Sequence, residues 1–353
     1  MSALATQDPP AATATPRRER PQWAIDLEPY AKPRWGRSLL DIATSVVPYL
    51  VLSVAMYMLV DYSYWLVLAI AVPAAGFLLR TFILFHDCTH GSFLPNRTAN
   101  RWVGIFCGLL ALQPYENWRH DHWAHHGSAG DLDRRGQGDV PTLTVAEYRA
   151  KSRPGRLGYW LFRHPVVMFG IGPIYSLVVM PRFYGSTATR AQKRSVIFTD
   201  IAVAAMIGGL CLLVGWQAFL LVQTPTVIMA GIAGVWLFYV QHQFEDVYWE
   251  SSDDWTYADA ALRGSSYLRL PKVLQFFTGN IGLHHVHHLN ARIPNYNLQR
   301  AHDDNEIFHD VPVLGFRDGI RSVRLKLWDE DRGRLVSFAE ARSPVAAPAA
   351  NTI

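Results

Sequence analysis

The sequence predicts an all-α membrane protein, with four transmembrane helices and a cytoplasmic helical cap that together hold a histidine-rich site for two metal ions. Two observations lead to this fold class. Half of the 353 residues are hydrophobic and only 18% are charged, a composition too apolar for most soluble chains of this length. The hydrophobic residues form long stretches, and three dense clusters of histidine lie at or beyond the ends of these stretches.

The first two predicted spans cover residues 39–60 and 64–85. Each is apolar over about 33 Å at about 1.5 Å per helical residue, which is enough to cross the hydrocarbon core of a bilayer. The first contains one charged residue, Asp41, at its edge, and the second contains Arg80 near its end. We expect the long Arg80 side chain to snorkel to the lipid headgroups while the helix continues to His86.

Two further spans are predicted at residues 197–215 and 225–241. Pro225 and the residues before it interrupt an otherwise continuous apolar stretch, so we expect a short turn near residues 216–226 to join the two spans. Asp200 lies close to the start of the third span, where it needs an interfacial position or a polar partner.

Two other apolar stretches are not predicted to cross the membrane. Residues 102–112 are too few and suit an interfacial or re-entrant helix. Residues 157–180 are numerous enough, but they contain Arg163, Pro165 and further glycine and proline in the middle. We therefore expect a pair of helices that lie in the membrane plane.

The histidine clusters test this topology, because residues that bind the same metal ions must lie on one side of the bilayer. An even number of crossings must separate the second cluster from the third, and the two spans between them satisfy this condition. The two outer turns then contain no Lys or Arg, whereas basic residues are frequent before the first span and between the second and third. The positive-inside rule places the N-terminus, the C-terminus and the histidine site on the cytoplasmic side.

The three histidine clusters have the spacing of metal ligands. On a helix, residues three or four apart project from one face within about 6 Å of each other. Neutral imidazole is the commonest metal ligand and suits iron, zinc, copper and nickel. Eight imidazoles are more than one ion binds, so two ions sharing them is the simplest arrangement. The predicted ligands are His86 and His90, then His122, His125 and His126, then His284, His287 and His288.

Several residues around these clusters could contribute. His242 lies just past the end of the fourth span, where position alone is equally consistent with a ligand and with a structural histidine. His120 is turned off the ligand face by its two-residue offset from His122. Acidic neighbours can accept the second ring N–H of a ligating histidine, or they can be exposed caps. The residues considered for a supporting role are Asp87, Asp121, Glu245, Asp246 and His285, of which His285 points away from its own cluster.

The number and location of the histidines select among metal functions. A structural zinc site is complete with four ligands, and a transporter places its ligands near the bilayer midplane and not at helix ends. Redox chemistry on a lipid fits better, because two irons at the membrane surface can activate dioxygen while an apolar slot holds a hydrocarbon chain beside them. Hydroxylation stays open as the outcome of this chemistry, as does a protein that binds or moves metal without catalysis.

The order HxxxH, HxxHH, HxxHH, separated by membrane spans, resembles the membrane-bound fatty acid desaturases. The resemblance extends from the first span to Leu298 and includes the stretches 114–119, 130–148 and 293–296. It is nearer to the acyl-lipid branch, which contains Δ12 (ω-6) desaturases, than to the acyl-CoA branch. One departure is Thr89, where acyl-lipid enzymes often have glycine.

The resemblance implies a non-haem di-iron centre that uses O2 and two electrons to introduce a cis double bond into an acyl chain, as an acyl-lipid Δ12-type desaturase does. It also implies that His242 ligates iron together with the three clusters. We expect no fused cytochrome b5 domain, and the three cysteines form no CxxC pair, so electrons must come from an external donor. A small acidic ferredoxin-like donor is expected to dock on a basic surface. This surface is formed by Arg149, Lys151, Arg153 and Arg156.

The chain is predicted to form a single membrane domain, residues 23–342, between flexible tails at 1–22 and 343–353. The tails are rich in small and polar residues, and the first lacks the apolar core of a signal peptide. Residues 303–342 are expected to cover the metal site as part of the cap. No nucleic-acid-binding motif is present. The sequence leaves open the double-bond position, the chain length, the acyl carrier (lipid, CoA or ACP), the donor and the oligomeric state.

Overall fold

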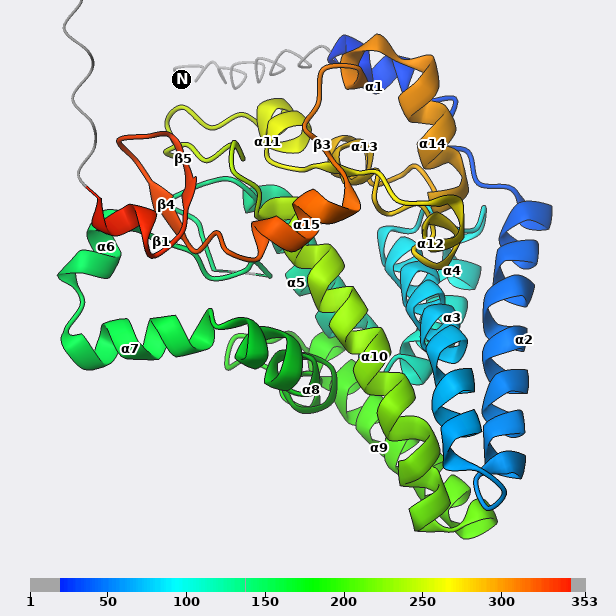
Figure 1. The fold of residues 1–353 in the computed structure, drawn as a ribbon. Helices are drawn as coiled ribbons and strands as arrows, with labels where there is room; N and C mark the ends of the chain where they lie inside the picture. The colour runs from blue at the N-terminus through cyan, green and yellow to red at the C-terminus, as the bar shows by residue number, and fades with distance from the viewer. Residues whose placement is uncertain (1–19, 137, 344–353) are drawn as a thin grey trace, which may run out of the picture.

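The computed structural model of the chain describes residues 20–136 and 138–343, and most of these residues are helical. Figure 1 shows long helices that run from turns at the bottom of the view to a cap of short helices and strands at the top. Residues 1–19 and 344–353, which make up most of the predicted tails, lie outside the described residues. The helices are α1 (Gln22–Asp26), α2 (Trp35–Leu59), α3 (Tyr64–His90), α4 (Arg97–Leu110), α5 (Tyr115–Ser128), α6 (Val145–Ala150), α7 (Arg153–Phe162), α8 (Gly172–Ile174), α9 (Arg190–Val214), α10 (Trp216–His242), α11 (Tyr257–Arg263), α12 (Lys272–Phe277), α13 (His284–Leu289), α14 (Asn295–Asp304) and α15 (Phe316–Ser322).

Four helices, α2, α3, α9 and α10, are long and apolar enough to cross a membrane, as the sequence predicts. α3 packs against both α2 and α10, and α9 packs against α10. Large apolar side chains such as Met58, Leu212 and Leu213 are exposed on these helices. An exposed apolar surface of this kind is expected where helices face lipid.

The turn between α9 and α10 differs from the prediction. The chain turns at Gly215, whose φ of +83° favours glycine, and α10 begins at the next residue, so the predicted turn over 216–226 is wrong. Pro225 lies inside α10, because neighbouring groups in a packed membrane helix can satisfy the backbone that proline frees. The Gln223 side chain is satisfied by the hydroxyls of two tyrosines of α2.

Charged residues inside the spans have partners within the protein. Arg80 is buried, forms an ion pair with Asp41 at 3.1 Å and donates to the carbonyl oxygen of Phe276. The expectation that Arg80 snorkels to the headgroups is therefore wrong, because an acidic partner on the adjacent helix compensates its charge. Asp200 has a polar partner of the kind it was expected to need, since Arg182 contacts it at 2.6 Å.

The segment after α6 is a bent pair of helices. α7 and the helical run Val167–Arg182, which includes α8, meet at an angle of 55°. Figure 1 shows α7 crosswise to α2 and α3, the arrangement expected of a helix in the membrane plane. α7 exposes Leu157, Trp160 and Phe162, which suit the lipid interface. α4, which contains most of the stretch predicted as interfacial, packs along α3 and is too short to cross.

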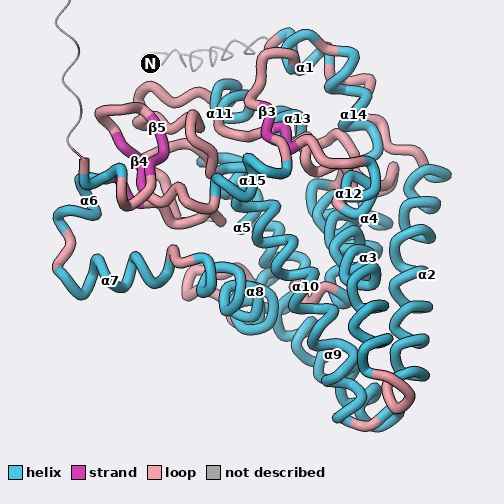
Figure 2. The backbone as a smooth tube through the Cα atoms, in the orientation of Figure 1, coloured by secondary structure: helices cyan, strands magenta, loops and turns pink. Residues whose placement is uncertain are grey.

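The cap contains two small sheets, so the all-α expectation applies to the spans but not to the whole chain. In the first sheet β4 pairs with β1 in parallel and with β5 in antiparallel, and in the second sheet β2 and β3 are parallel. Figure 2 shows β3, β4 and β5 in the cap, beyond the ends of the long helices. These pairings join residues 303–342 to earlier segments of the cap. The strands are β1 (Leu143–Thr144), β2 (Tyr267–Leu268), β3 (Val313–Leu314), β4 (Leu327–Asp329) and β5 (Arg334–Val336).

Candidate metal centre

Nine histidines from α3, α5, α10 and α13 converge at the end of the spans that carries the cap. Their ring nitrogens form two groups, and within each group one nitrogen from every residue lies within 4.8 Å of all the others. The three clusters and His242 therefore meet at one end of the spans, as a shared metal site requires. The first group is His86, His90, His122, His126 and His287, and the second is His125, His242, His284 and His288.

The short helix α13 shows how the sequence positions the third cluster. It has only six residues, too few for a stable isolated helix. Val286 and Leu289 anchor one side of α13 in a buried apolar cluster that includes Leu298 and Phe308. The three clustered histidines then face the other histidine-bearing helices. The packing of the cap, and not helix propensity, holds this cluster in place.

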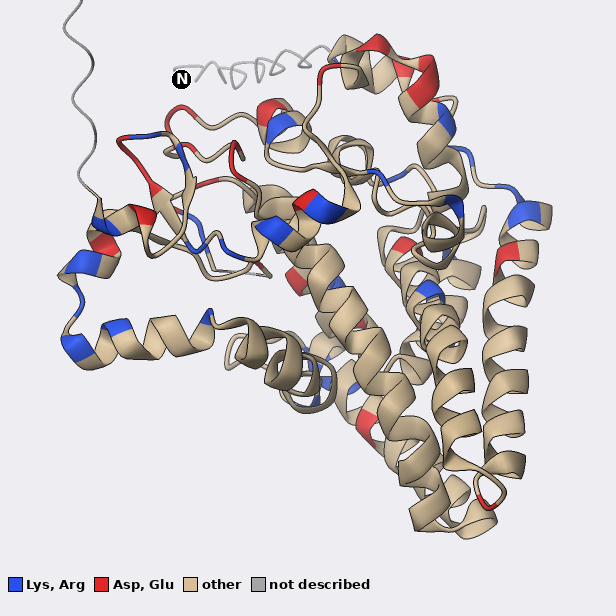
Figure 3. Ribbon diagram, in the orientation of Figure 1, with Lys and Arg blue, Asp and Glu red and all other residues tan. Residues whose placement is uncertain are grey.

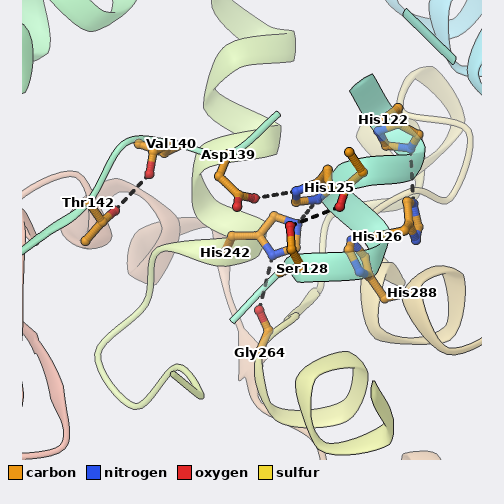
Figure 4. A network of polar contacts seen from close by, with 12 residues as sticks. His122, His125, His126, Ser128, Asp139, Val140, Thr142, His242, Gly264 and His288 are labelled. Carbon is orange, nitrogen blue, oxygen red and sulfur yellow. Dashed lines mark hydrogen bonds and ion pairs between the residues drawn. The ribbon is translucent and has the colours of Figure 1, made fainter. Parts of the chain in front are cut away.

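Hydrogen bonds fix which nitrogen carries the proton in two histidines of the second group (Figure 4). His125 Nδ1 donates to Asp139 Oδ1 at 2.5 Å, and His242 Nδ1 donates to the Gly264 carbonyl oxygen at 3.2 Å. In a neutral ring the other nitrogen then carries a lone pair. The two Nε2 atoms nevertheless face each other at 3.1 Å. Two lone pairs at this distance repel unless a cation lies against both, and a metal ion provides that cation.

The other nitrogens of the second group have spacings that fit the same explanation. His284 Nε2 lies 2.9 Å from His242 Nε2 and 3.1 Å from His288 Nε2. Two ligands at right angles on a metal with bonds of about 2.1 Å are about 3.0 Å apart. The nitrogens of this group therefore have the separations of neighbouring ligands on one ion.

The first group has a similar arrangement. His126 Nε2 lies 3.1 Å from His122 Nε2 and 3.0 Å from His287 Nε2. His90 is buried, and neither of its ring nitrogens has a hydrogen-bond partner among the described residues. A buried polar ring without a partner is costly, so the residues of this group also fit a bound metal ion.

Burial keeps these imidazoles neutral. Among the histidines outside the spanning helices, burial lowers the pKa of five well below the usual range, and the neighbouring imidazoles lower each pKa further. Neutral imidazole is the form that binds a metal ion. The five are His122, His126, His284, His287 and His288.

Asp87 is the one predicted supporting residue that lies at the site. Its Oδ1 accepts from His86 Nδ1 at 3.1 Å, and its Oδ2 accepts from the backbone N–H of Asn295 at 2.7 Å. The other four residues considered for this role have different partners or are exposed to solvent. Asp121 is exposed and pairs with His120, Glu245 pairs with Arg334, Asp246 is exposed, and His285 Nε2 lies 3.0 Å from His302 Nδ1.

Asp139 is a supporting residue that the sequence prediction missed. It lies in the loop after α5, 14 positions from His125, and its side chain is only 9% exposed. Gly138 allows the loop to approach α5, because its φ of +70° favours glycine and a Cβ there would lie 3.0 Å from the carbonyl oxygen of Asp121. A glycine followed by an acidic residue shortly after the second cluster is the signal in the sequence that points to this loop.

Comparisons with known proteins indicate the family to which the chain belongs. The family model described as fatty acid desaturase matches residues 63–312, which is well over half of the chain and includes both histidine groups. A protein named fatty acid desaturase from Bacillus subtilis (strain 168) is 45% identical over 320 residues, and the match covers 90% of this chain and 91% of the relative.

More distant relatives have more specific names. A Synechocystis protein named sn-1 acyl-lipid omega-3 desaturase (ferredoxin) is 28% identical over 244 residues, covering 66% of this chain and 64% of the relative. Another Synechocystis protein, named sn-1 oleoyl-lipid 12-desaturase, is 26% identical over 296 residues, covering 78% of this chain and 76% of the relative. The extent of the family match and the identity to the Bacillus protein show that the chain belongs to the fatty acid desaturase family and is an oxidoreductase.

Proposed function

We propose that the protein uses O2 to introduce a cis double bond into a fatty acyl chain at a non-haem di-iron centre. Two adjacent methylene groups each lose one hydrogen atom, and a carbon–carbon double bond forms between them. Both oxygen atoms of O2 leave as water, which requires two further electrons from an external donor and two protons from solvent. Membership of the family and the geometry of the two histidine groups support this reaction.

The observation that carries the metal assignment is the pair of opposed Nε2 lone pairs on His125 and His242. The proposed ligands are the nine histidines of the two groups, and an all-imidazole donor set suits iron. When bound, two iron ions would supply the activation of dioxygen that an unactivated methylene requires. The protein contributes fixed ligand positions and fixed ring tautomers.

Residues around the ligands support this role. Asp139 and Gly264 hold two imidazoles in the tautomer whose Nε2 is free. The Trp118 ring stacks on His122 at 4.3 Å between centroids, and the Phe238 ring lies 5.2 Å from that of His125. These aromatic rings place apolar surface against the centre, which favours a hydrocarbon substrate and disfavours bulk water.

For the substrate, we propose an acyl chain esterified in a membrane lipid, with the new double bond at the Δ12 position. Two Synechocystis relatives are named for acyl-lipid and oleoyl-lipid substrates, and the second is named as a 12-desaturase. Two of the four apolar helices, α3 and α10, end at histidines of the centre, which also gives a lipid chain a route to the centre from within the bilayer.

For the electron donor, we propose a small acidic ferredoxin-like protein. Relatives from Synechocystis and Nostoc carry the word ferredoxin in their names. Figure 3 shows basic residues on α6 and at the start of α7, at one edge of the cap, where an acidic partner could dock. Replacing the four basic residues of this surface by glutamine should remove the salt dependence of electron transfer, and transfer that keeps its salt dependence would contradict this docking site.

We further propose that the termini and the histidine site are cytoplasmic. Figure 3 shows Lys and Arg concentrated near the cap and none at the turns at the bottom of the view, which agrees with the positive-inside rule. Tyr62, in the turn between α2 and α3, is 81% exposed. A Tyr62→Cys variant should react with a membrane-impermeant thiol reagent added to intact cells, and protection from that reagent would contradict this orientation.

Expression in a host rich in oleate, followed by mass spectrometry of its fatty acids, tests the reaction. A diene with the new bond at Δ12 supports the proposal, a bond elsewhere would correct the position, and a hydroxy acid would replace desaturation by hydroxylation. Metal analysis of the purified protein tests the centre, with two iron ions per chain expected. His125→Ala should lower that ratio, whereas His120→Ala is the matched control because His120 lies outside both groups.

A further inference from the structure

A polar cavity of about 200 Å³ lies beside the metal centre, between the cap ends of α2 and α3 and the segment that contains α12. Arg37 and Asp41 of α2 and Arg80 of α3 line one part of it. Lys272 of α12 and Asn295 of α14 line another part. None of these residues belongs to the two histidine groups, so the cavity is a separate feature of the molecule.

The charges that line the cavity favour an anion. Three basic residues, Arg37, Arg80 and Lys272, accompany a single carboxylate, Asp41. Arg80 and Arg37 lie 3.1 Å and 3.6 Å from the same oxygen of Asp41, so a single negative charge faces two positive charges. The cavity therefore has an excess of two positive charges, which suits a phosphate group.

Buried polar atoms in the wall lack partners. Asn295 is 1% exposed, yet neither its side-chain oxygen nor its side-chain nitrogen has a hydrogen-bond partner among the described residues. Arg80 Nε is likewise buried and unpartnered in the described part of the chain. Each such atom carries the cost of lost hydration, so the wall offers hydrogen bonds that a bound ligand can complete.

The surface next to the cavity is apolar and suits lipid. α12 exposes Val273, Leu274 and Phe276 to different extents, from 40% to 67%, and Phe276 also lines the cavity. An exposed apolar segment beside basic residues is typical of protein at the membrane interface, where headgroup phosphates lie. A lipid in this position can place its headgroup in the cavity and its chains against the spans.

A short path connects the cavity to the metal centre. The backbone N–H of Asn295 donates to Asp87, and the other oxygen of Asp87 contacts His86 of the first group. Arg80 and Asp87 lie on one face of α3, about two helical turns or about 10 Å apart along its axis. A headgroup bound in the cavity would thus be held at a fixed height relative to the histidines.

We propose that this cavity binds the phosphate group of a phospholipid and so positions the acyl chain of that lipid at the metal centre. Arg37 and Lys272 bind the phosphate oxygens, Asn295 donates a further hydrogen bond, and the buried Arg80 adds positive charge to the cavity wall. The statement that the bound lipid is the substrate rests on the proposed function, whereas the binding of a phosphate-bearing lipid does not. The site holds the lipid by its headgroup and leaves the acyl chain free to extend toward the histidines.

The test compares two lipids with the same oleoyl chains, phosphatidylglycerol and diacylglycerol, titrated into the purified full-length protein in detergent and followed by native mass spectrometry. We expect the wild type to bind phosphatidylglycerol more tightly, because diacylglycerol lacks the phosphate. Arg37→Gln/Lys272→Gln removes two basic residues at exposed positions and should weaken phosphatidylglycerol binding about 30-fold. Arg317→Gln/Arg321→Gln is the matched control, since it removes two exposed arginines of α15 and should leave the preference intact.

Three results would overturn the headgroup site. The first is equal binding of the two lipids by the wild type, and the second is unchanged phosphatidylglycerol binding by the Arg37→Gln/Lys272→Gln variant. The third is displacement of the lipid by inorganic phosphate at matching concentration, which would indicate a site for the free anion. Steady-state kinetics then tests the substrate part: the variant should have a raised KM for phospholipid and an unchanged kcat. A wild type that makes no unsaturated product would contradict the proposed function while the lipid-binding result stands separately.

Discussion

Asp139→Asn is the change that most directly tests how the metal centre is held. Asp139 is a nearly buried carboxylate that accepts from His125 Nδ1 at 2.5 Å and so fixes the Nε2 lone pair toward His242. Asparagine fills the same space but carries no charge, and its amide can present a donor to His125. A hydrogen bond to a charged group contributes about 1.5–3 kcal/mol, which corresponds to about 10- to 100-fold in a binding constant. Changes to residues that orient a metal ligand have effects of the same size.

We therefore expect Asp139→Asn to bind iron about 10- to 100-fold more weakly and to form product correspondingly more slowly at limiting iron. Iron titration of the metal-free protein and product formation by mass spectrometry measure the two effects. Asp121→Asn is the matched control, because Asp121 precedes His125 by one helical turn but is exposed and pairs with His120. Wild-type iron affinity and rate in Asp139→Asn, or an equal loss in Asp121→Asn, would refute the assignment of Asp139. A circular dichroism melt of each variant separates loss of iron from loss of fold.

Three further predictions concern the same region. His287→Ala should abolish product formation while the protein still inserts into the membrane, and the control His120→Ala should still form product. Unsaturated product from His287→Ala in a fatty-acid profile would count against the proposed ligand set. Gly138→Ala forces a side chain into left-handed backbone and should lower the free energy of unfolding by about 1–2 kcal/mol. Gly127→Ala is the control, because a Cβ at this position on α5 meets open space. Equal melting temperatures of the two variants would contradict this prediction. The metal-free protein should be most stable above about pH 6.5 and should lose stability as the pH falls. The pKa values of the buried imidazoles are lower in the folded protein than in the unfolded chain, so the unfolded chain binds more protons at acidic pH. A melting temperature that rises on acidification would contradict this prediction.

The predicted spans and ligand clusters depended on short-range patterns in the sequence. Hydrophobic length alone gave the four spans, because a bilayer requires the same length of apolar helix wherever it is crossed. The spacing of His86 and His90, or of His122 and His126, places two rings on one helix face whatever the rest of the chain does. These parts of the site needed no knowledge of which distant segments meet.

The errors concern residues whose partners lie far away in the sequence or across a helix packing interface. Arg80 was expected to reach lipid headgroups, but α2 packs against α3 and brings Asp41 to it at 3.1 Å. Asp121 was the nearer acidic neighbour of His125 in the sequence, yet the loop that contains Asp139 supplies the carboxylate. The identity of a single residue does not reveal which partner its side chain has, because the partner depends on how two segments pack.

By itself, the amino-acid sequence determined that this chain has four helices long and apolar enough to cross a membrane, and three sets of paired or triple imidazoles, because helical periodicity and the thickness of a bilayer are local constraints. The tertiary structure decided how the nine histidines divide into two groups, that Asp139 orients His125, and that Arg80 lines a cationic cavity next to the centre. The physical reason is that metal ligation, charge compensation and cavity shape all depend on atoms that meet only after the helices pack and the cap folds over their ends.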